Sequence, residues 1–361
     1  MPTALSLTRV LNPNPGWYSG DFHCHTNFSD GHYEPVELVE VARREGLDFF
    51  WITDHNTFGA YEHFGDPDDV LVLPGMEVTF GPGHYNTFGI QEQGGWIKGI
   101  CDGDWRVREL HGRTLAEVVG QTAAAGLLNS INHPLLEPWA WVNADTDLHC
   151  VHGMEIWNDP SWPDNRRANP AAVRLWTDLL NAGHRITAIG GSDFHRPEPA
   201  PGQDKPAERL GCPRTYVYAR ELSGAAVLAA VRQQRAYVSR GQRVSFAALA
   251  GAECYEIGAD VGAASGPVSF VGTVAECPDG ARVQIVCNGA PIAVYESRGG
   301  EVTIEWDMLA RPDESAWVRL DTYDADGLML AITNPIFFGP RPEPDRFYYG
   351  DFVDTGKLRN G

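Results

Sequence analysis

Two histidines separated by a single residue constrain the fold of this chain more than any other feature. They are His23 and His25, in the stretch WYSGDFHCHTNFSD at positions 17–30. We expect a strand over Tyr18–Cys24. Side chains two apart on a strand point to the same face, so both imidazoles would face one place. Asp30 follows five residues after His25 in a Ser-Asp-Gly turn. An HxH pair alone is weak evidence, because such pairs also occur on ordinary protein surfaces.

Five further motifs follow, and in each an apolar run leads into a polar residue. The last, Gly190–His195, repeats the spacing of two with a carboxylate and an imidazole. A single histidine near a strand end is more often structural than a ligand, but six motifs in order are hard to produce by chance. Imidazole nitrogens and carboxylate oxygens without a thiolate cluster suit Zn²⁺, Mn²⁺ or Fe ions. The candidate metal ligands are His23, His25, Asp30, His55, Glu77, His84, His133, Asp193 and His195.

Strands and helices alternate over the first two thirds of the chain. The continuously apolar run LDFFWIT at 47–53 is typical of a buried parallel strand. Polar residues that follow strands predict a (β/α) barrel, whose site lies at the carboxyl ends of its strands. A regular eight-fold barrel is not expected, because no helix separates the strands of Glu77 and His84. We expect helices over 34–45, 114–126, 169–182 and 223–234, and further strands over 70–74, 76–80, 84–90, 127–132, 152–157, 185–190 and 214–218.

From about residue 241 the pattern changes to short alternating segments separated by Gly-containing turns, and helical periodicity is absent. This predicts a small all-β, sandwich-like domain over 241–361, after a first domain over 1–240. The tail from 340 onward has no clear periodicity, and we expect it to pack over the first domain. The predicted strands are 268–274, 281–287, 301–306 and 317–323, with turns at Asp279-Gly280, Asn288-Gly289 and Asp326-Gly327.

Composition limits the expected cellular compartment and the expected class of binding partner. The 361 residues carry a formal net charge of −20, which argues against a nucleic-acid backbone as partner. Seven scattered cysteines, with no CxxC pair, favour a reducing compartment. No signal-peptide pattern and no long apolar window are visible, so we expect a cytoplasmic protein with no membrane span. A small-molecule substrate is the expected partner, and the sequence carries no signal for an oligomeric state.

The six motifs, in this order, resemble the PHP (polymerase and histidinol phosphatase) metallohydrolase family over roughly residues 16–240. The trailing β-rich segment looks most like the CehA/McbA-like branch of that family. The resemblance implies an α/β fold with a distorted (β/α)₇ TIM-like barrel and a trinuclear site with two to three divalent ions (Zn, Mn or Fe). It implies one ion held by His23, His25, Glu77 and Asp193, a second held by Glu77, His84 and His133, and a third held by Asp30, His55 and His195.

One ligand position has a competitor. His111, in the irregular stretch 91–113, competes with His84, which we favour because it begins a strand shortly after Glu77. The remaining histidines are expected to be structural: His32, His63, His149, His152 and His184.

The resemblance implies hydrolysis by a metal-bridging hydroxide. We expect a phosphoesterase acting on a small phosphate monoester or a nucleotide-like phosphodiester. Hydrolysis of a carboxylic ester or carbamate on the same metal site is the alternative, and a non-catalytic PHP scaffold is a third hypothesis. A pocket rich in Arg and Lys would favour phosphate, whereas an aromatic wall of Trp139, Trp141 and Trp157 would favour an aryl carbamate. Candidate substrate contacts are Arg196 and Asn158, with Glu155 a further pocket candidate and Arg185 and Arg240 weaker ones.

Overall fold

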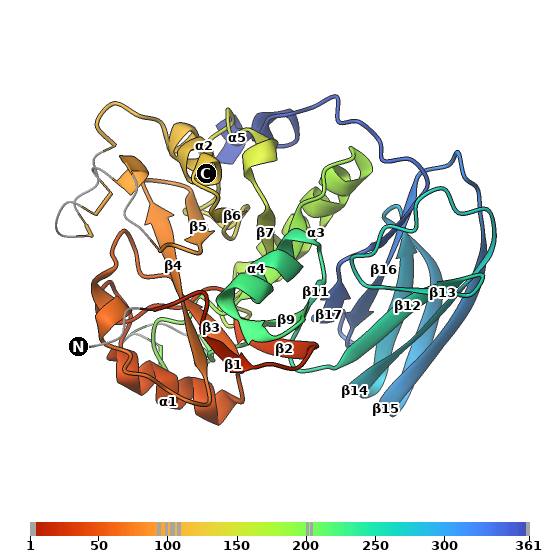
Figure 1. Ribbon diagram of the computed structural model, residues 1–361, viewed down its shortest axis with the longest axis horizontal. Coiled ribbons are helices and arrows are strands. Elements are labelled where there is room, and N and C mark those ends of the chain that lie inside the picture. The colour runs from red at the N-terminus through yellow and green to blue at the C-terminus, as the bar shows by residue number, and fades with distance from the viewer. Residues whose placement is uncertain are drawn as a thin grey trace.

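The computed structural model describes residues 5–91, 95–97, 100–101, 105–106, 110–199, 202 and 205–358. It shows a mixed α/β fold. Strands and helices of the first two thirds of the chain form one α/β region, and the β-rich region of the last third lies beside it (Figure 1). No helix within the described part of the chain is long and apolar enough to cross a membrane.

Seven strands that carry the site lie side by side in chain order. The parallel pairs are β2 with β3, β3 with β4, β6 with β7, and β7 with β8. β5 runs antiparallel to β4 and β6, because only four residues, 80–83, separate β4 from β5 and leave no room for a crossover helix. The strands are β2 Gly16–Asp21, β3 Phe49–Ile52, β4 Leu71–Thr79, β5 His84–Phe88, β6 Leu128–Ile131, β7 Gly153–Asn158 and β8 Thr187–Gly191.

The two ends of this strand series meet. An isolated parallel bridge joins Cys24, just after β2, to Phe194, just after β8, and the His25 amide donates to the Phe194 carbonyl at 3.0 Å. The sheet is consistent with a TIM-like fold, and the distorted seven-stranded barrel stays a prediction.

Local capping signals explain the first two helices, which are confirmed. α1, Pro35–Glu45, ends at Gly46, which adopts the left-handed conformation at φ 67°. α2, Leu115–Ala124, begins at the predicted capping box, where the Thr114 hydroxyl accepts from the Glu117 amide at 3.1 Å. α4, Gly224–Arg232, is likewise capped by the side chain of Ser223.

The predicted start of the third helix is wrong. α3 spans Asn165–Asn181 and so begins four residues earlier than predicted. Asn169 does not cap the helix. Its side chain instead binds the end of β7, accepting from the Asn158 amide at 3.0 Å and donating to the Asn158 carbonyl at 2.7 Å. A tertiary contact therefore uses the residue that sequence reasoning treated as a cap.

The last third is antiparallel and pairs with the first region. The long strand β14 joins the segments 268–274 and 281–287, which were predicted as separate, and β15 extends well beyond the predicted strand 301–306. The expected turn at Asp279-Gly280 lies beside a register shift inside β14. The turns at Asn288-Gly289 and Asp326-Gly327 are confirmed. The strands are β12 Val244–Ala250, β13 Glu253–Glu256, β14 Gly266–Cys287, β15 Ala290–Ala310, β16 Ala316–Tyr323, β17 Met329–Thr333 and β18 Ile336–Phe338.

The remaining elements are short or connect the two regions. The strands are β1 Val10–Asn12, β9 Arg214–Ala219, β10 Leu222–Ser223 and β11 Ala236–Ser239. The helical turns are η1 Gly59–Glu62, η2 Gly95–Ile97, η3 Leu148–Cys150, η4 Tyr349–Asp351 and α5 Thr355–Leu358.

The two regions share one sheet and one apolar core. β17 pairs antiparallel with β11, and Asn334 exchanges two hydrogen bonds with the Ala188 backbone on β8. One buried apolar cluster includes Trp176 from α3 together with Trp317 and Phe337 from the last third. The division into domains 1–240 and 241–361, and the sandwich, therefore stay predictions.

The tail returns to the first region, as expected (Figure 1). Tyr349 is fully buried, and its amide donates to the Thr146 carbonyl at 3.0 Å. Tyr348 forms an isolated bridge with Asp147. The prediction that the tail packs over the first region is confirmed.

Candidate metal centre

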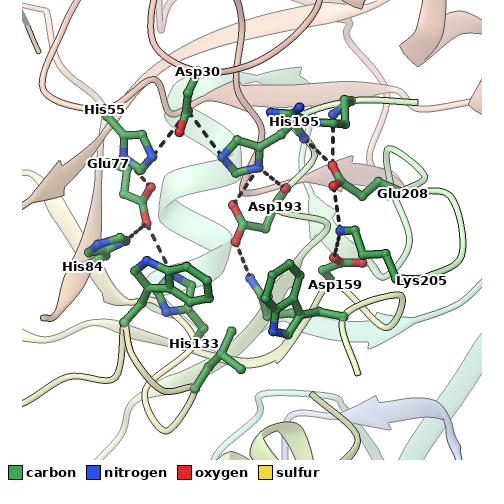
Figure 2. A pocket seen from close by; sticks show the side chains of 15 residues that line it. Asp30, His55, Glu77, His84, His133, Asp159, Asp193, His195, Lys205 and Glu208 are labelled. Carbon is green, nitrogen blue, oxygen red and sulfur yellow. Dashed lines mark hydrogen bonds and ion pairs between the residues drawn. The ribbon is translucent and has the colours of Figure 1, made fainter. Parts of the chain in front are cut away.

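One buried carboxylate, that of Glu77 on β4, lies at the centre of the predicted ligand set. Its side chain is 1% exposed. Its Oε1 lies 3.2 Å from His23 Nε2, 3.1 Å from His84 Nδ1 and 3.5 Å from His133 Nε2. The Asn132 amide also donates to Oε1 at 2.8 Å. Three imidazoles from β5 and the ends of β2 and β6 thus converge on one carboxylate oxygen, and Figure 2 shows two of them, His84 and His133, beside Glu77.

The second oxygen of Glu77 faces two further histidines. Oε2 lies 2.9 Å from His55 Nδ1 and 3.5 Å from His25 Nε2. His55 Nδ1 is also 2.7 Å from the Thr79 hydroxyl. Glu77 therefore connects two sets of imidazoles through its two oxygens, which is the geometry that a bridging carboxylate requires.

Two aspartates complete the predicted set. Asp193 Oδ1 lies 3.2 Å from both His23 Nε2 and His25 Nε2. Asp30 Oδ1 lies 3.5 Å from His55 Nε2 and 3.3 Å from His195 Nε2 (Figure 2). The structure thus brings all nine predicted residues together.

The donor geometry fits metal ions. Two ligand atoms bound to one ion at about 2.1 Å lie roughly 3.0–3.4 Å apart, and most separations above fall near that range. Several buried side-chain atoms that could bind a metal lack a hydrogen-bond partner. They are His23 Nε2, His25 Nδ1, Asp30 Oδ1, Glu77 Oε2 and His133 Nδ1. Unsatisfied buried polar atoms of this kind are costly, and an ion would satisfy those that face it. Three compact groups result: His25, Asp30, His55 and His195; His23, His25 and Asp193; and His55, Glu77 and His84.

These groups differ in part from the expected partition. His25 belongs to two groups, where the family resemblance assigned it to one ion. His55 joins the groups of Asp30 and of Glu77. Ligand roles stay predictions, but the residues are placed so that ions could share ligands.

The predicted strand over Tyr18–Cys24 ends earlier than expected, at Asp21. The side chain of Asp21, which sequence reasoning missed, fixes the backbone that follows. β2 ends at Asp21, so His23 and His25 lie beyond the strand. Asp21 is fully buried and accepts from the amides of His23 and Ser192 at 3.0 Å and of Gly211 at 2.7 Å. Burial raises the pKa of Asp21, although these hydrogen bonds oppose the shift. Asp21 therefore fixes His23 by binding its backbone.

The buried carboxylate of Asp54 holds the chain segment between two predicted ligands. Asp54 accepts from the Thr26 amide and hydroxyl at 2.7 and 2.6 Å and from the Ser29 hydroxyl at 2.7 Å. Burial raises the pKa of Asp54 to about 6. Asp54 thereby shapes the turn between His25 and Asp30. Its place between the apolar run at 47–53 and His55 was the only sequence signal for it.

Glu155 on β7 orients two of the predicted ligands. Its Oε1 lies 3.0 Å from His23 Nδ1, and its Oε2 accepts from the His133 amide at 2.8 Å. The second ring nitrogen of a metal-binding histidine commonly pairs with such a carboxylate. Asn158 bridges Glu155 Oε2, at 3.1 Å, and Asp193 Oδ2, at 3.3 Å.

Burial and the neighbouring charged groups set the pKa of each imidazole. Burial, together with repulsion from His195 and His55, lowers the pKa of His25 to about 3. Burial lowers the pKa of His84 to about 4, although Glu77 opposes the shift. Burial opposes protonation of His55 as well, but the attraction of Glu77 raises its pKa to about 10. His25 and His84 are thus neutral near pH 7, the form in which imidazole binds a metal.

A pocket of about 280 Å³ opens onto these residues. Both predicted substrate contacts, Arg196 and Asn158, line it, as does Trp139. Their role in binding substrate stays a prediction. Sequence reasoning missed five other lining residues, namely Leu136, Asp159, Trp162, Lys205 and Glu208.

Several weaker candidates lie elsewhere. Arg185 pairs with Asp260 at 3.0 Å, stacks on the Phe337 ring and lies outside the pocket of the candidate metal centre. Arg240 lines a separate pocket, and His111 lies beside Trp96 in another surface depression. Of the three tryptophans considered for an aromatic wall, Trp139 lines the pocket, whereas Trp141 and Trp157 are buried in the core.

The comparisons with known proteins agree with this picture. A family model for the PHP domain matches residues 21–92. The uncharacterized protein MJ1295 of Methanocaldococcus jannaschii is 38% identical over 179 residues, which cover 46% of this chain and 70% of that protein. Residues 21–92 therefore carry a PHP domain, and the chain belongs to the same family as this Methanocaldococcus protein.

Two solved structures are more distant neighbours. A two-domain protein from Bacteroides vulgatus, described as containing a predicted PHP-like metal-dependent phosphoesterase, is 18% identical with a TM-score of 0.49, covering 93% of this chain and 99% of that one. The lesion-specific endonuclease EndoQ of Pyrococcus furiosus is 14% identical with a TM-score of 0.42, covering 61% of this chain and 56% of that one. The family assignment rests on the sequence matches.

Proposed function

We propose that the protein is a metal-dependent hydrolase, and that it is a phosphoesterase acting on a small phosphate monoester or nucleotide-like phosphodiester. The observation that carries the proposal is the convergence of five histidines on the buried Glu77 carboxylate, beside a pocket that also holds Arg196 and Lys205. The proposal includes a distorted seven-stranded barrel, which the bridge between Cys24 and Phe194 supports. It also includes membership of the CehA/McbA-like branch.

Two to three divalent ions (Zn, Mn or Fe) would be held by the nine predicted ligands. Eight of them make up the three groups described above, and the ninth, His133, lies beside Glu77. When bound, such ions lower the pKa of coordinated water and neutralise the oxygens of the scissile group. Glu77 links the groups, while Asp21 and Asp54 fix the backbone on either side of His25. In a preformed set of this kind the side chains are already ordered by folding, so substrate binding does not have to supply the free energy of ordering them.

The substrate side of the pocket is built from the chain's own cations and aromatic rings. Arg196 and Lys205 would donate to anionic oxygens, and Asn158 supplies a neutral amide. Leu136 and Trp139 would cover the organic part of the substrate and exclude water.

Hydrolysis of a carboxylic ester or carbamate is the second candidate. The rings of Trp139 and Trp162 lie edge to face with centroids 5.5 Å apart, and they give the pocket an aromatic corner that fits an aryl group. The non-catalytic scaffold hypothesis has less support, because a binding module gains nothing from so many buried unpaired donor atoms.

Parallel turnover of p-nitrophenyl phosphate, bis-p-nitrophenyl phosphate and a 1-naphthyl carbamate tests the proposal. We expect turnover of at least one phosphate ester that EDTA abolishes and Mn²⁺ or Zn²⁺ restores. Carbamate turnover alone would move the protein to acyl chemistry. Turnover that resists chelation would contradict metal dependence.

A further inference from the structure

Lysine is rare in this chain, and one lysine lies in the pocket wall. The sequence has three lysines, at positions 98, 205 and 357, among 28 basic residues. Lys205 lines the pocket, and its side chain is only 5% exposed. A buried ammonium loses its hydration and needs acceptors within the protein. A chain that uses arginine at nearly every basic position thus places a compact ammonium beside the candidate metal centre.

The Glu208 carboxylate connects this lysine to the candidate metal centre through hydrogen bonds. Its Oε1 lies 2.8 Å from Lys205 Nζ (Figure 2). Its Oε2 accepts from the amides of His195 at 2.7 Å and Arg196 at 3.0 Å. His195 is a predicted ligand, and Arg196 is a predicted substrate contact. The position of the ammonium is therefore set relative to both.

A second carboxylate holds the other side of the ammonium. Asp159 Oδ2 lies 3.5 Å from Lys205 Nζ, while its Oδ1 is engaged by the amide and hydroxyl of Ser161. The ammonium lies 4.9 Å from the centre of the Trp162 ring. An ammonium has three N–H donors, and within the described part of the chain two carboxylates accept from it. The third N–H of the Lys205 ammonium is left to donate to a group bound in the pocket.

We propose that Lys205 contacts the substrate and makes the site selective for phosphate monoesters over diesters, an inference that rests on the proposed phosphoesterase function. A monoester near neutral pH carries up to two negative charges where a diester carries one, and attraction to a fixed cation grows with that charge. Lys205 and Arg196 line the same pocket, so both act on the group bound there. Lysine presents a point charge to a single oxygen, which a planar guanidinium does not reproduce.

A purely structural role is the competing explanation. In that case Lys205 would only neutralise Glu208 and Asp159, and its loss would affect every substrate equally. Substrate charge separates the two roles, because only a direct contact responds to it.

The kinetic test compares four proteins on two substrates. Values of kcat/KM for p-nitrophenyl phosphate and bis-p-nitrophenyl phosphate are measured for the wild type, Lys205→Met, Lys205→Arg and the control Lys357→Met. Lys357 pairs with Asp354, and its side chain is 84% exposed. We expect Lys205→Met to lower the monoester value roughly 10- to 100-fold and the diester value less than about threefold. Lys205→Arg should restore part of the loss, and Lys357→Met should change neither value.

Binding of inorganic phosphate to the metal-loaded proteins gives a readout that does not need turnover. Calorimetry should show an affinity about tenfold weaker for Lys205→Met than for the wild type, and unchanged for Lys357→Met. Equal losses on both substrates with unchanged phosphate affinity would overturn the inference alone. A wild type that hydrolyses neither phosphate ester would overturn the proposed function itself.

Discussion

Glycine is required at the end of β8 by the close approach of a predicted ligand. A Cβ on Gly191 would lie 2.4 Å from the Cβ of His23 and 2.8 Å from the His23 amide nitrogen. Backbone and Cβ atoms cannot move aside as the tip of a long side chain can. Residue 191 thus packs closely against His23, whose backbone amide donates to Asp21.

We expect Gly191→Ala to displace His23. The substitution should destabilise the fold by about 1–3 kcal/mol through overpacking and should reduce bound metal. Gly16→Ala on β2 is the control, because among the described residues no atom beyond its chain neighbours lies within 4 Å of the Cβ it would add. It should leave stability within about 1 kcal/mol. Urea unfolding with metal analysis measures both, and metal content equal to the wild type in Gly191→Ala would contradict the account.

His152, away from the metal centre, gives a pH-dependent contribution to stability. Its Nδ1 accepts from the Asn129 amide at 3.2 Å. Burial, together with the charge of Arg232, lowers its pKa to about 4 from an ordinary value of 6.5. The unfolded chain therefore binds more protons between these pH values, so stability is present above about pH 6.5 and is lost as the pH falls toward 4.

Unfolding free energies of the wild type and His152→Asn at pH 8 and pH 5 test this. Asparagine can still accept from the Asn129 amide but does not titrate. The wild type should lose about 1–2 kcal/mol more than the variant on acidification. Equal losses in the two proteins would show that His152 does not contribute.

At the scale of elements, a helix side chain fixes the strand end that faces the pocket. Asn169 on α3 binds both backbone polar groups of Asn158 at the end of β7. Asn158 in turn contacts Glu155 and Asp193. The packing of α3 on β7 is therefore coupled to the candidate site.

Two variants of similar stability should differ in activity. Asn169→Ala removes the two hydrogen bonds to β7, and Thr114→Ala removes the cap of α2 at a distance from the pocket. Each should cost about 1–2 kcal/mol. We expect only Asn169→Ala to lower kcat/KM, by roughly tenfold. Thermal unfolding together with phosphate ester turnover checks both, and an equal effect on activity would argue against the coupling.

The parts that the sequence predicts are those with local causes. The capping box at Thr114 and the glycine stop at Gly46 identify helix ends within one turn of chain. The nine ligand candidates are found because each lies shortly after an apolar run. Asn169 was misread because a partner eleven positions away uses its side chain. Lys205 was missed because its pairing with Asp159 spans 46 positions.

At the scale of the whole molecule, the last third of the chain completes the fold of the first. Ile332 and Phe337 belong to the same buried cluster as Trp176 and Val238. Asn334 binds the backbones of Ala188 and Ala236. Removal of the last third would expose this apolar surface and leave β11 as an open edge.

We therefore expect a chain truncated after residue 240 to aggregate or to unfold without cooperativity. Expression of residues 1–240, followed by size-exclusion chromatography and calorimetry, measures this. A soluble, cooperatively folded fragment with the metal content of the full chain would show instead that the two regions are independent domains.

The most direct test of the central claim is the metal content of the full-length protein, measured beside phosphate ester turnover in the wild type and in Glu77→Gln. Both oxygens of Glu77 face predicted ligands, so the amide cannot bridge them as a carboxylate does. We predict two to three divalent ions per wild-type chain, with at least one ion lost and turnover reduced about 100-fold or more in the variant. Wild-type protein without bound metal, or Glu77→Gln with unchanged metal and turnover, would contradict the account.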